Sequence, residues 1–162
     1  MPYFIRRLPE INCGKDHKLH GPQLRIDFRY CCTHCRVHEH RGAGKEDYEI
    51  DHFRPKGKPE FKHLEFEYSN LYWSCHVCNN NKGGYWPNPN EIANGYRFVD
   101  LCSEEWDLHY RVEPDGELIP LTNAAGFTAD RLRLNRDHLK DLRAECMLAG
   151  LDWSSPKFGY RV

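Results

Sequence analysis

The sequence lacks the features that would place it in a membrane or direct it out of the cell. It contains no run of about 18 apolar residues, the length that a transmembrane helix needs. Arg6 and Arg7 lie near the start, where a signal peptide would be apolar. We therefore expect a cytoplasmic protein with no membrane partner.

An excess of charge of either sign is also absent. The formal net charge is -1, which excludes a uniformly basic, histone-like binder of nucleic acid but leaves room for a local basic patch. Hydrophobic residues make up 40% and charged residues 29% of the 162 positions, so we expect one globular domain, residues 1–162, rather than a disordered chain. Basic side chains gather in residues 52–63, where Glu60 alone opposes them. They are Arg54, Lys56, Lys58 and Lys62.

Cysteine and histidine are abundant, with eight and ten copies. In a reducing cytoplasm, paired cysteines indicate a metal site rather than disulfides. Two Cys-x-x-Cys pairs stand out, Cys32 with Cys35 and Cys75 with Cys78. Four thiolates complete a tetrahedral zinc shell and leave no open position, so we expect a structural zinc site. Cys31 competes with Cys32 but does not keep the two-residue gap, and the alternative of two chance pairs of buried thiols stays open.

The segment between the two cysteine pairs predicts a short β-hairpin followed by a helix. Residues 48–53 have the composition of a strand, and Pro55 ends that strand and opens a loop. The second cysteine pair leads into Asn79, and Gly83 and Gly84 then break the chain. This arrangement would bring Asp51 and His52 against Asn79.

The order and spacing of these motifs, over about residues 30–84, resemble the HNH endonucleases, also called ββα-metal nucleases. The matching residues are Cys32, Cys35, Asp51, His52, Asn70, Leu71, Cys75, Cys78, Asn79, Asn80 and Lys82. The resemblance implies an α+β fold with a zinc-stapled ββα-metal core at about residues 30–90. An N-terminal flank precedes this core, and a hairpin-plus-helix extension follows it at about residues 96–150.

Three segments of that extension carry a second resemblance. FVDLCSEEW, EPDGELIPLT and LRLNRDHLKDLR look like the C-terminal part of a group of small bacterial HNH proteins. Some of those proteins accompany ATPases in anti-phage systems of the Septu and retron type. The resemblance therefore implies an anti-phage defence effector that works with an ATPase partner.

The first resemblance implies metal-dependent hydrolysis of phosphodiester bonds, with DNA as the expected substrate and RNA left open. A histidine with a pKa near neutrality suits the general base, and His52 is the candidate. A Mg²⁺ or Mn²⁺ ion would be held by oxygens of Asp51 and Asn79. Because neighbours on a strand point to opposite faces, Asp51 and His52 can both face the ion only if the strand ends or bends there. Pro55 makes such an end feasible.

Four further residues complete the candidate site. Asn70 resembles the middle asparagine of the HNH family, which orients the loop that bears the base. The candidates for contacts with phosphate groups are Arg54, Lys56 and Lys82.

Each central residue also has a structural interpretation. Asp51 could lie in a surface turn, and His52 could be a hydrogen-bonded structural histidine. Asn70 could form a turn, and Asn79 could cap the following helix. A non-catalytic zinc module that binds nucleic acid or protein would explain the cysteines alone. An endonuclease would explain all four of these residues together with the cysteines.

The extension predicts a strand, a hairpin and a helix. The strand is expected at residues 96–101, and the hairpin at residues 108–122 with its turn at residues 113–116. Thr128 or Asn135 is expected to cap a helix. The apolar positions of that helix are Leu139, Leu142 and Cys146.

Overall fold

The structure is a computed structural model that describes residues 14–151 and 153. Its contacts divide the chain into two compact units, which we call the first unit (up to Trp86) and the second unit (from Pro87). Each unit contains helices and a two-stranded antiparallel sheet, which confirms the mixed α+β class. The single domain over residues 1–162 stays a prediction. Within the part of the chain that the structure describes, no helix is long and apolar enough to cross a membrane.

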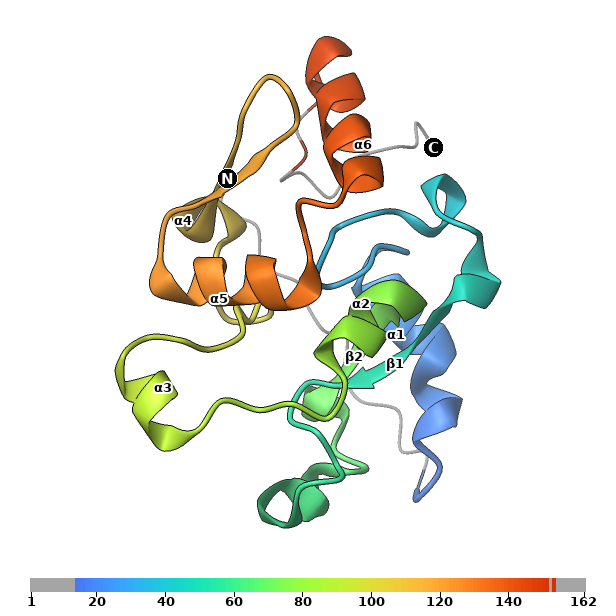
Figure 1. Cartoon of the computed structure of the whole chain (residues 1–162). Helices are drawn as coiled ribbons and strands as arrows, with labels where there is room; N and C mark the ends of the chain where they lie inside the picture. Colours follow the sequence, from blue (N-terminus) through green and yellow to red (C-terminus); the bar gives the residue numbers. More distant parts are fainter. Residues whose placement is uncertain (1–13, 152, 154–162) are drawn as a thin grey trace. The chain divides into compact units, whose positions relative to one another are not determined.

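The first unit is built on a β-hairpin with a helix at its end (Figure 1). Its helices and strands are α1 (Gly21–Asp27), β1 (Tyr48–His52), β2 (Leu71–Cys75) and α2 (His76–Lys82). Short 3-10 turns join them: η1 (His17–His20), η2 (Glu39–Arg41), η3 (Lys45–Asp47), η4 (Pro59–Leu64) and η5 (Tyr68–Asn70). The antiparallel register pairs Tyr48 with Cys75 and His52 with Leu71. The predicted hairpin and helix therefore form, with β1 ending one residue earlier than expected.

The core of the first unit lies along β2, all five residues of which are buried. Leu24 and Phe28 lie four residues apart at α1 and its C-terminal end, so both point to the same side, and both are fully buried. The ring of Phe28 lies 5.4 Å from that of Tyr72, and the ring of Phe53 stacks on Tyr72 at 4.8 Å. This packing sets the hairpin against α1 and determines which face of β1 is left for other contacts.

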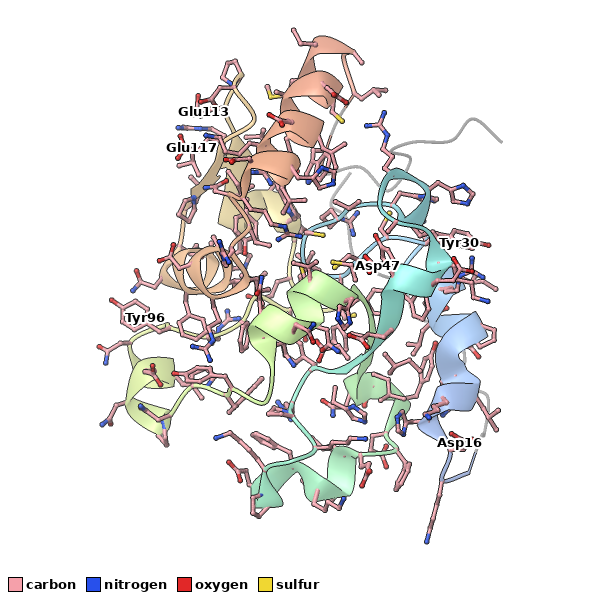
Figure 2. All side chains as sticks on the ribbon, turned by 45° about the vertical axis from the view of Figure 1, so that its right-hand side comes forward. Asp16, Tyr30, Asp47, Tyr96, Glu113 and Glu117 are labelled. Atoms are coloured by element: carbon pink, nitrogen blue, oxygen red, sulfur yellow. The ribbon has the colours of Figure 1, made fainter. Side chains whose placement is uncertain are left out.

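The second unit contains a hairpin between short helices (Figure 1). Its elements are α3 (Pro89–Ala93), α4 (Trp106–His109), β3 (Tyr110–Val112), β4 (Leu118–Pro120), α5 (Asn123–Leu132) and α6 (Asp137–Leu148). Figure 2 labels Glu113 and Glu117, which close the hairpin turn through a 2.8 Å hydrogen bond from the Glu113 N–H to the Glu117 carbonyl. The predicted hairpin, its turn and the final helix are thus present.

Three predictions for the second unit are wrong. Residues 96–101 form no strand, because the N–H of Val99 donates to the Thr128 hydroxyl at 2.9 Å instead of to a neighbouring strand. Thr128 lies inside α5, and Thr122 caps that helix by accepting from the Ala125 N–H at 3.1 Å. Asn135 also caps no helix, since its side chain bonds both backbone groups of Leu118 at 2.8 and 2.9 Å.

The turn of the second hairpin packs against α6 at Gly116. This glycine has a φ of +84°, and a Cβ at this position would lie 1.9 Å from the Lys140 carbonyl oxygen. Arg143 is buried beside it and donates to the Gly116 carbonyl at 2.6 Å and to the Leu134 carbonyl at 2.9 Å. Only a residue without a side chain fits this close approach.

Candidate functional site

The two cysteine pairs meet in one buried cluster in the first unit. The sulfur atoms of Cys32, Cys35, Cys75 and Cys78 all lie within 4.8 Å of one another. Sulfurs bound to one zinc ion at about 2.3 Å would be about 3.8 Å apart, and the Cys35 and Cys75 sulfurs are separated by 3.9 Å. Donor type, number and burial therefore fit a structural zinc site.

The cluster contains Cys32 and not Cys31, as the two-residue gap predicted. Burial raises the pKa of the Cys31 thiol to about 11, which favours the neutral form. The Cys32 N–H bonds the Val37 carbonyl at 2.9 Å, and the His34 N–H points at the Cys32 sulfur at 3.4 Å. The first cysteine pair is thus a tight turn whose backbone is directed at its own sulfur.

Two contacts hold this turn against the hairpin. The Thr33 N–H donates to the Trp73 carbonyl on β2 at 2.8 Å. The Tyr48 hydroxyl on β1 donates to the Val37 carbonyl at 2.7 Å, and its ring stacks on Trp73 at 5.9 Å. Because the second cysteine pair lies where β2 passes into α2, the cluster joins the turn, the hairpin and the helix.

Asp51 is buried and contacts both α2 and the turn formed by the first cysteine pair. Its carboxylate oxygens accept from the Lys82 ammonium at 2.7 Å and contact the His34 ring Nε2 at 3.0 Å. Burial by itself would raise the pKa of Asp51, but the Lys82 ammonium and the His34 ring together lower it below its usual value. Asp51 is therefore an ionised carboxylate with a partner at each oxygen.

His52 follows Asp51 as the last residue of β1, so its side chain points to the opposite face of the strand from that of Asp51. Its ring Nε2 lies 2.9 Å from the Glu65 carbonyl oxygen. A carbonyl only accepts hydrogen bonds, which assigns the proton to Nε2 and the lone pair to Nδ1. Burial lowers the pKa of His52, so the neutral ring is the main form at pH 7.

Asn70 braces the backbone that follows His52. Its side-chain oxygen accepts from the Arg54 N–H at 2.8 Å, and its side-chain nitrogen donates to the Arg54 carbonyl at 3.0 Å. Its backbone carbonyl accepts from the Phe53 N–H at 2.9 Å. Asn70 thus holds the backbone at Phe53 and Arg54, and the role that the resemblance implies for it stays a prediction.

Asn79 and Asp51 are bonded to different partners. The Asn79 side chain donates to the Glu49 carboxylate at 2.9 Å, and the His76 ring contacts the same carboxylate oxygen at 3.2 Å. Glu49 and Asp51 are two residues apart and lie on the same face of β1. Asn79 and Lys82 lie about one turn apart on α2. The helix thus pairs with the strand twice, once through Asn79 and once through Lys82.

The three predicted phosphate contacts differ in exposure. Arg54 is exposed, and Lys56 is half-exposed, with its ammonium 3.7 Å from Glu65. Lys82 is only 1% exposed, and its ammonium also donates to the His52 carbonyl at 2.7 Å. A phosphate group could reach Lys82 only if this interior ion pair opened.

Sequence reasoning missed His34, Glu49 and His17. The ring of His17, on η1, lies edge-on to His52 with 4.9 Å between centroids. The spacing of Glu49 and Asp51 was a usable signal, because residues two positions apart on a strand lie on the same face. No signal in the sequence placed His17 beside His52, since 35 positions separate them.

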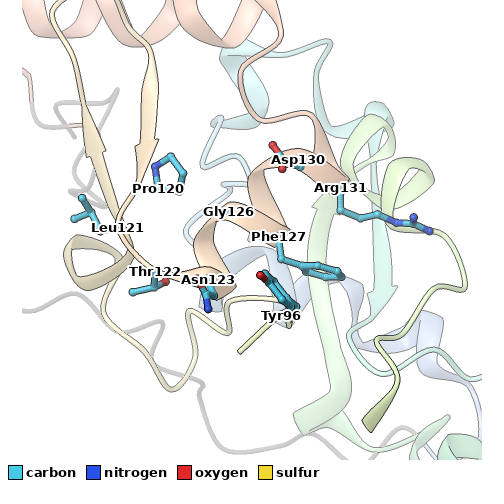
Figure 3. Close-up of a pocket in the computed structure, with 9 residues that line it drawn as sticks. All are labelled: Tyr96, Pro120, Leu121, Thr122, Asn123, Gly126, Phe127, Asp130 and Arg131. Carbon is cyan, nitrogen blue, oxygen red and sulfur yellow. The ribbon is translucent and has the colours of Figure 1, made fainter. Parts of the chain in front are cut away.

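The second unit has a pocket of about 740 Å³ beside α5 (Figure 3). Its lining includes Tyr96, Asn123, Phe127 and Arg131. It contains none of the site residues predicted from the sequence.

Comparison with known proteins adds no family to this description. No protein-family model matches the chain, and no curated protein matches it.

Proposed function

We propose that the first unit hydrolyses phosphodiester bonds in nucleic acid, with DNA as its substrate and His52 as its general base. The observation that carries this proposal is the setting of the His52 ring. A hydrogen bond to the Glu65 carbonyl holds one nitrogen as donor, and burial favours the neutral form, so Nδ1 can accept a proton. A base near pH 7 needs a neutral imidazole with a defined tautomer.

The chain's own residues supply a simple course for the reaction. As a water oxygen attacks phosphorus, its proton passes to Nδ1 of His52. The bond from phosphorus to the leaving oxygen breaks, and the leaving oxygen keeps the electron pair and takes a proton from solvent water. Arg54 and Lys56 follow His52 and would contact the phosphate oxygens. Asn70 acts as a positioning residue, because it binds the Arg54 backbone on both sides.

The arrangement of Asp51 and Asn79 does not fit a shared divalent cation. Both oxygens of Asp51 already have partners, while the Asn79 amide nitrogen donates to Glu49, which leaves the Asn79 oxygen as the one candidate ligand of the two side chains. The Lys82 ammonium lies beside Asp51, where a cation bound to this carboxylate would have to lie. The cleavage assay therefore tests the requirement for Mg²⁺ or Mn²⁺ that the resemblance implies by comparing reactions with and without these ions.

The second candidate function, a non-catalytic zinc module that binds nucleic acid or protein, has one observation in its favour. The Asp51–Lys82 pair is closed and buried, as expected of a structural ion pair. The anti-phage role and the ATPase partner rest on the resemblance alone. In that role, the nuclease would stay inactive until the ATPase partner is present.

The test is cleavage of supercoiled plasmid by zinc-loaded protein with Mg²⁺, with Mn²⁺ or with neither. His52→Ala should reduce nicking by roughly 10²–10⁴-fold, the contribution of a general base, at unchanged zinc content and melting temperature. His138→Ala, which changes an exposed histidine on α6, is the matched control and should cut like wild type. If wild type does not cut, the assay is repeated with the product of the neighbouring gene. Failure there as well would favour the zinc module.

A further inference from the structure

A second imidazole lies at His52, and it comes from the segment before the cysteine pairs. The rings of His17 and His52 meet edge to face, with 4.9 Å between centroids and 72° between planes. On its other side, the His17 ring lies 6.3 Å from that of Phe66. Within residues 14–151 and 153, the His17 ring nitrogens form no hydrogen bond.

The turn that carries His17 is fixed at both ends. Asp16, labelled in Figure 2, caps η1 by accepting from the Lys18 N–H at 3.1 Å. His20 closes the turn, is 1% exposed, and packs on Tyr68 with 5.0 Å between ring centroids. Side chains three residues apart in a 3-10 turn lie above one another, so buried His20 directs His17 toward the same side. The contact with His52 therefore follows from the anchoring of η1.

Two ammonium groups and two carboxylates influence the His17 ring. Burial and then the Lys56 ammonium lower the pKa of His17, while Asp16 and Glu65 act in the opposite direction and Lys18 adds to the lowering. Lys56 also contributes to the lowering at His52. A phosphate group bound beside His17 would add a negative charge next to the ring and so favour a charged, hydrogen-bonding His17.

We infer that His17 is a second substrate-contacting residue, whose imidazole donates a hydrogen bond to a phosphate of the nucleic acid held at His52. This inference rests on the proposed function and adds a residue to the same site. Three features carry it: the ring contact with His52, the anchored η1, and ring nitrogens that no described residue uses. Phosphate contacts of this kind position the substrate and do not read its sequence.

The experiment compares three substitutions of His17 with His138→Ala, at the exposed histidine of α6, as the matched control. His17→Phe keeps a ring to pack on His52 and Phe66 but removes the nitrogens. His17→Gln removes the ring but keeps a donor, and His17→Ala removes both. Each zinc-loaded protein is measured twice: binding of a short labelled DNA duplex by fluorescence anisotropy without added Mg²⁺ or Mn²⁺, and plasmid cleavage as above.

His17→Phe and His17→Ala should weaken duplex binding by about 10- to 100-fold, the range for one hydrogen bond to a charged group. His17→Gln should recover part of that loss, and His138→Ala should change binding less than threefold. A His17→Phe protein that binds like wild type would overturn the inference, because the ring would then serve packing alone. If such a protein also cuts like wild type, the proposed nuclease stands without His17. Wild-type protein that binds no duplex would likewise overturn the inference, and the plasmid assay would still judge the nuclease.

Discussion

Substitution of Lys82 by methionine should destabilise the first unit strongly. The Lys82 ammonium is 1% exposed and donates to the Asp51 carboxylate and to the His52 carbonyl, both at 2.7 Å. Methionine has a similar shape but cannot donate, so Asp51 would be left as a buried charge with only His34 as partner. Loss of one member of a buried ion pair costs about 3–5 kcal/mol. That is a large part of the roughly 5–15 kcal/mol that stabilises a small domain.

The assay is urea unfolding of zinc-loaded protein, followed by tryptophan fluorescence, with zinc content measured for each variant. Asp51→Asn alone should also destabilise, because it leaves the ammonium buried without its carboxylate. The double variant should lose less than the sum of the two single losses, by about 1–3 kcal/mol of coupling energy. Lys62→Met is the matched control, since Lys62 bonds Glu65 at 2.5 Å but is 68% exposed. It should cost about 0.5 kcal/mol or less.

A Lys82→Met protein as stable as the Lys62→Met protein would refute this reasoning. Lys82 would then have no buried role, and its ammonium would be available for the phosphate contact that the sequence predicted. Additive single losses would be equally damaging, since they would show that Lys82 and Asp51 do not interact.

Three further predictions concern the zinc cluster, the second hairpin and the pH dependence of the proposed cleavage. Cys75→Ser should lose zinc and melt at a lower temperature, because metal binding is coupled to folding; equal zinc content would contradict the cluster. Gly116→Ala should destabilise the second unit by about 2–4 kcal/mol in urea, from backbone strain and the clash with Lys140, whereas Gly126→Ala inside α5 should be neutral or stabilising. Cleavage should fall as pH drops through a His52 pKa below 6.5 and be flat near pH 7, and a midpoint above 6.5 would point to another base.

The parts of the fold that the sequence predicted depend on local spacing. Two cysteines separated by two residues can reach one ion whatever surrounds them, and the predicted cluster is present. Residues 48–53 have the composition of a strand, and β1 occupies Tyr48–His52. The hairpin turn at residues 113–116 was equally local, because proline, aspartate and glycine favour a turn in any context.

The parts that the sequence did not predict depend on how elements pack. Lys82 was expected to contact phosphate groups, and only the rotation of α2 over β1 turns it toward Asp51. The same rotation gives Asn79 to Glu49. Residues 96–101 have the composition of a strand, but their partner is Thr128 of α5 and not another strand. Composition indicates that a segment is buried, and tertiary contacts decide what it is buried against.

The zinc cluster and His52 belong to one chain of contacts. His34 lies within the first cysteine pair and contacts Asp51, Asp51 binds the Lys82 ammonium, and that ammonium binds the His52 carbonyl. Zinc that holds four thiolates has no open position for substrate, yet its loss would release His34 and remove one of the two partners of Asp51. The backbone of His52 would then lose part of its support. A zinc-depleted protein should therefore lose the proposed cleavage through the displacement of His52, without zinc taking part in the chemistry.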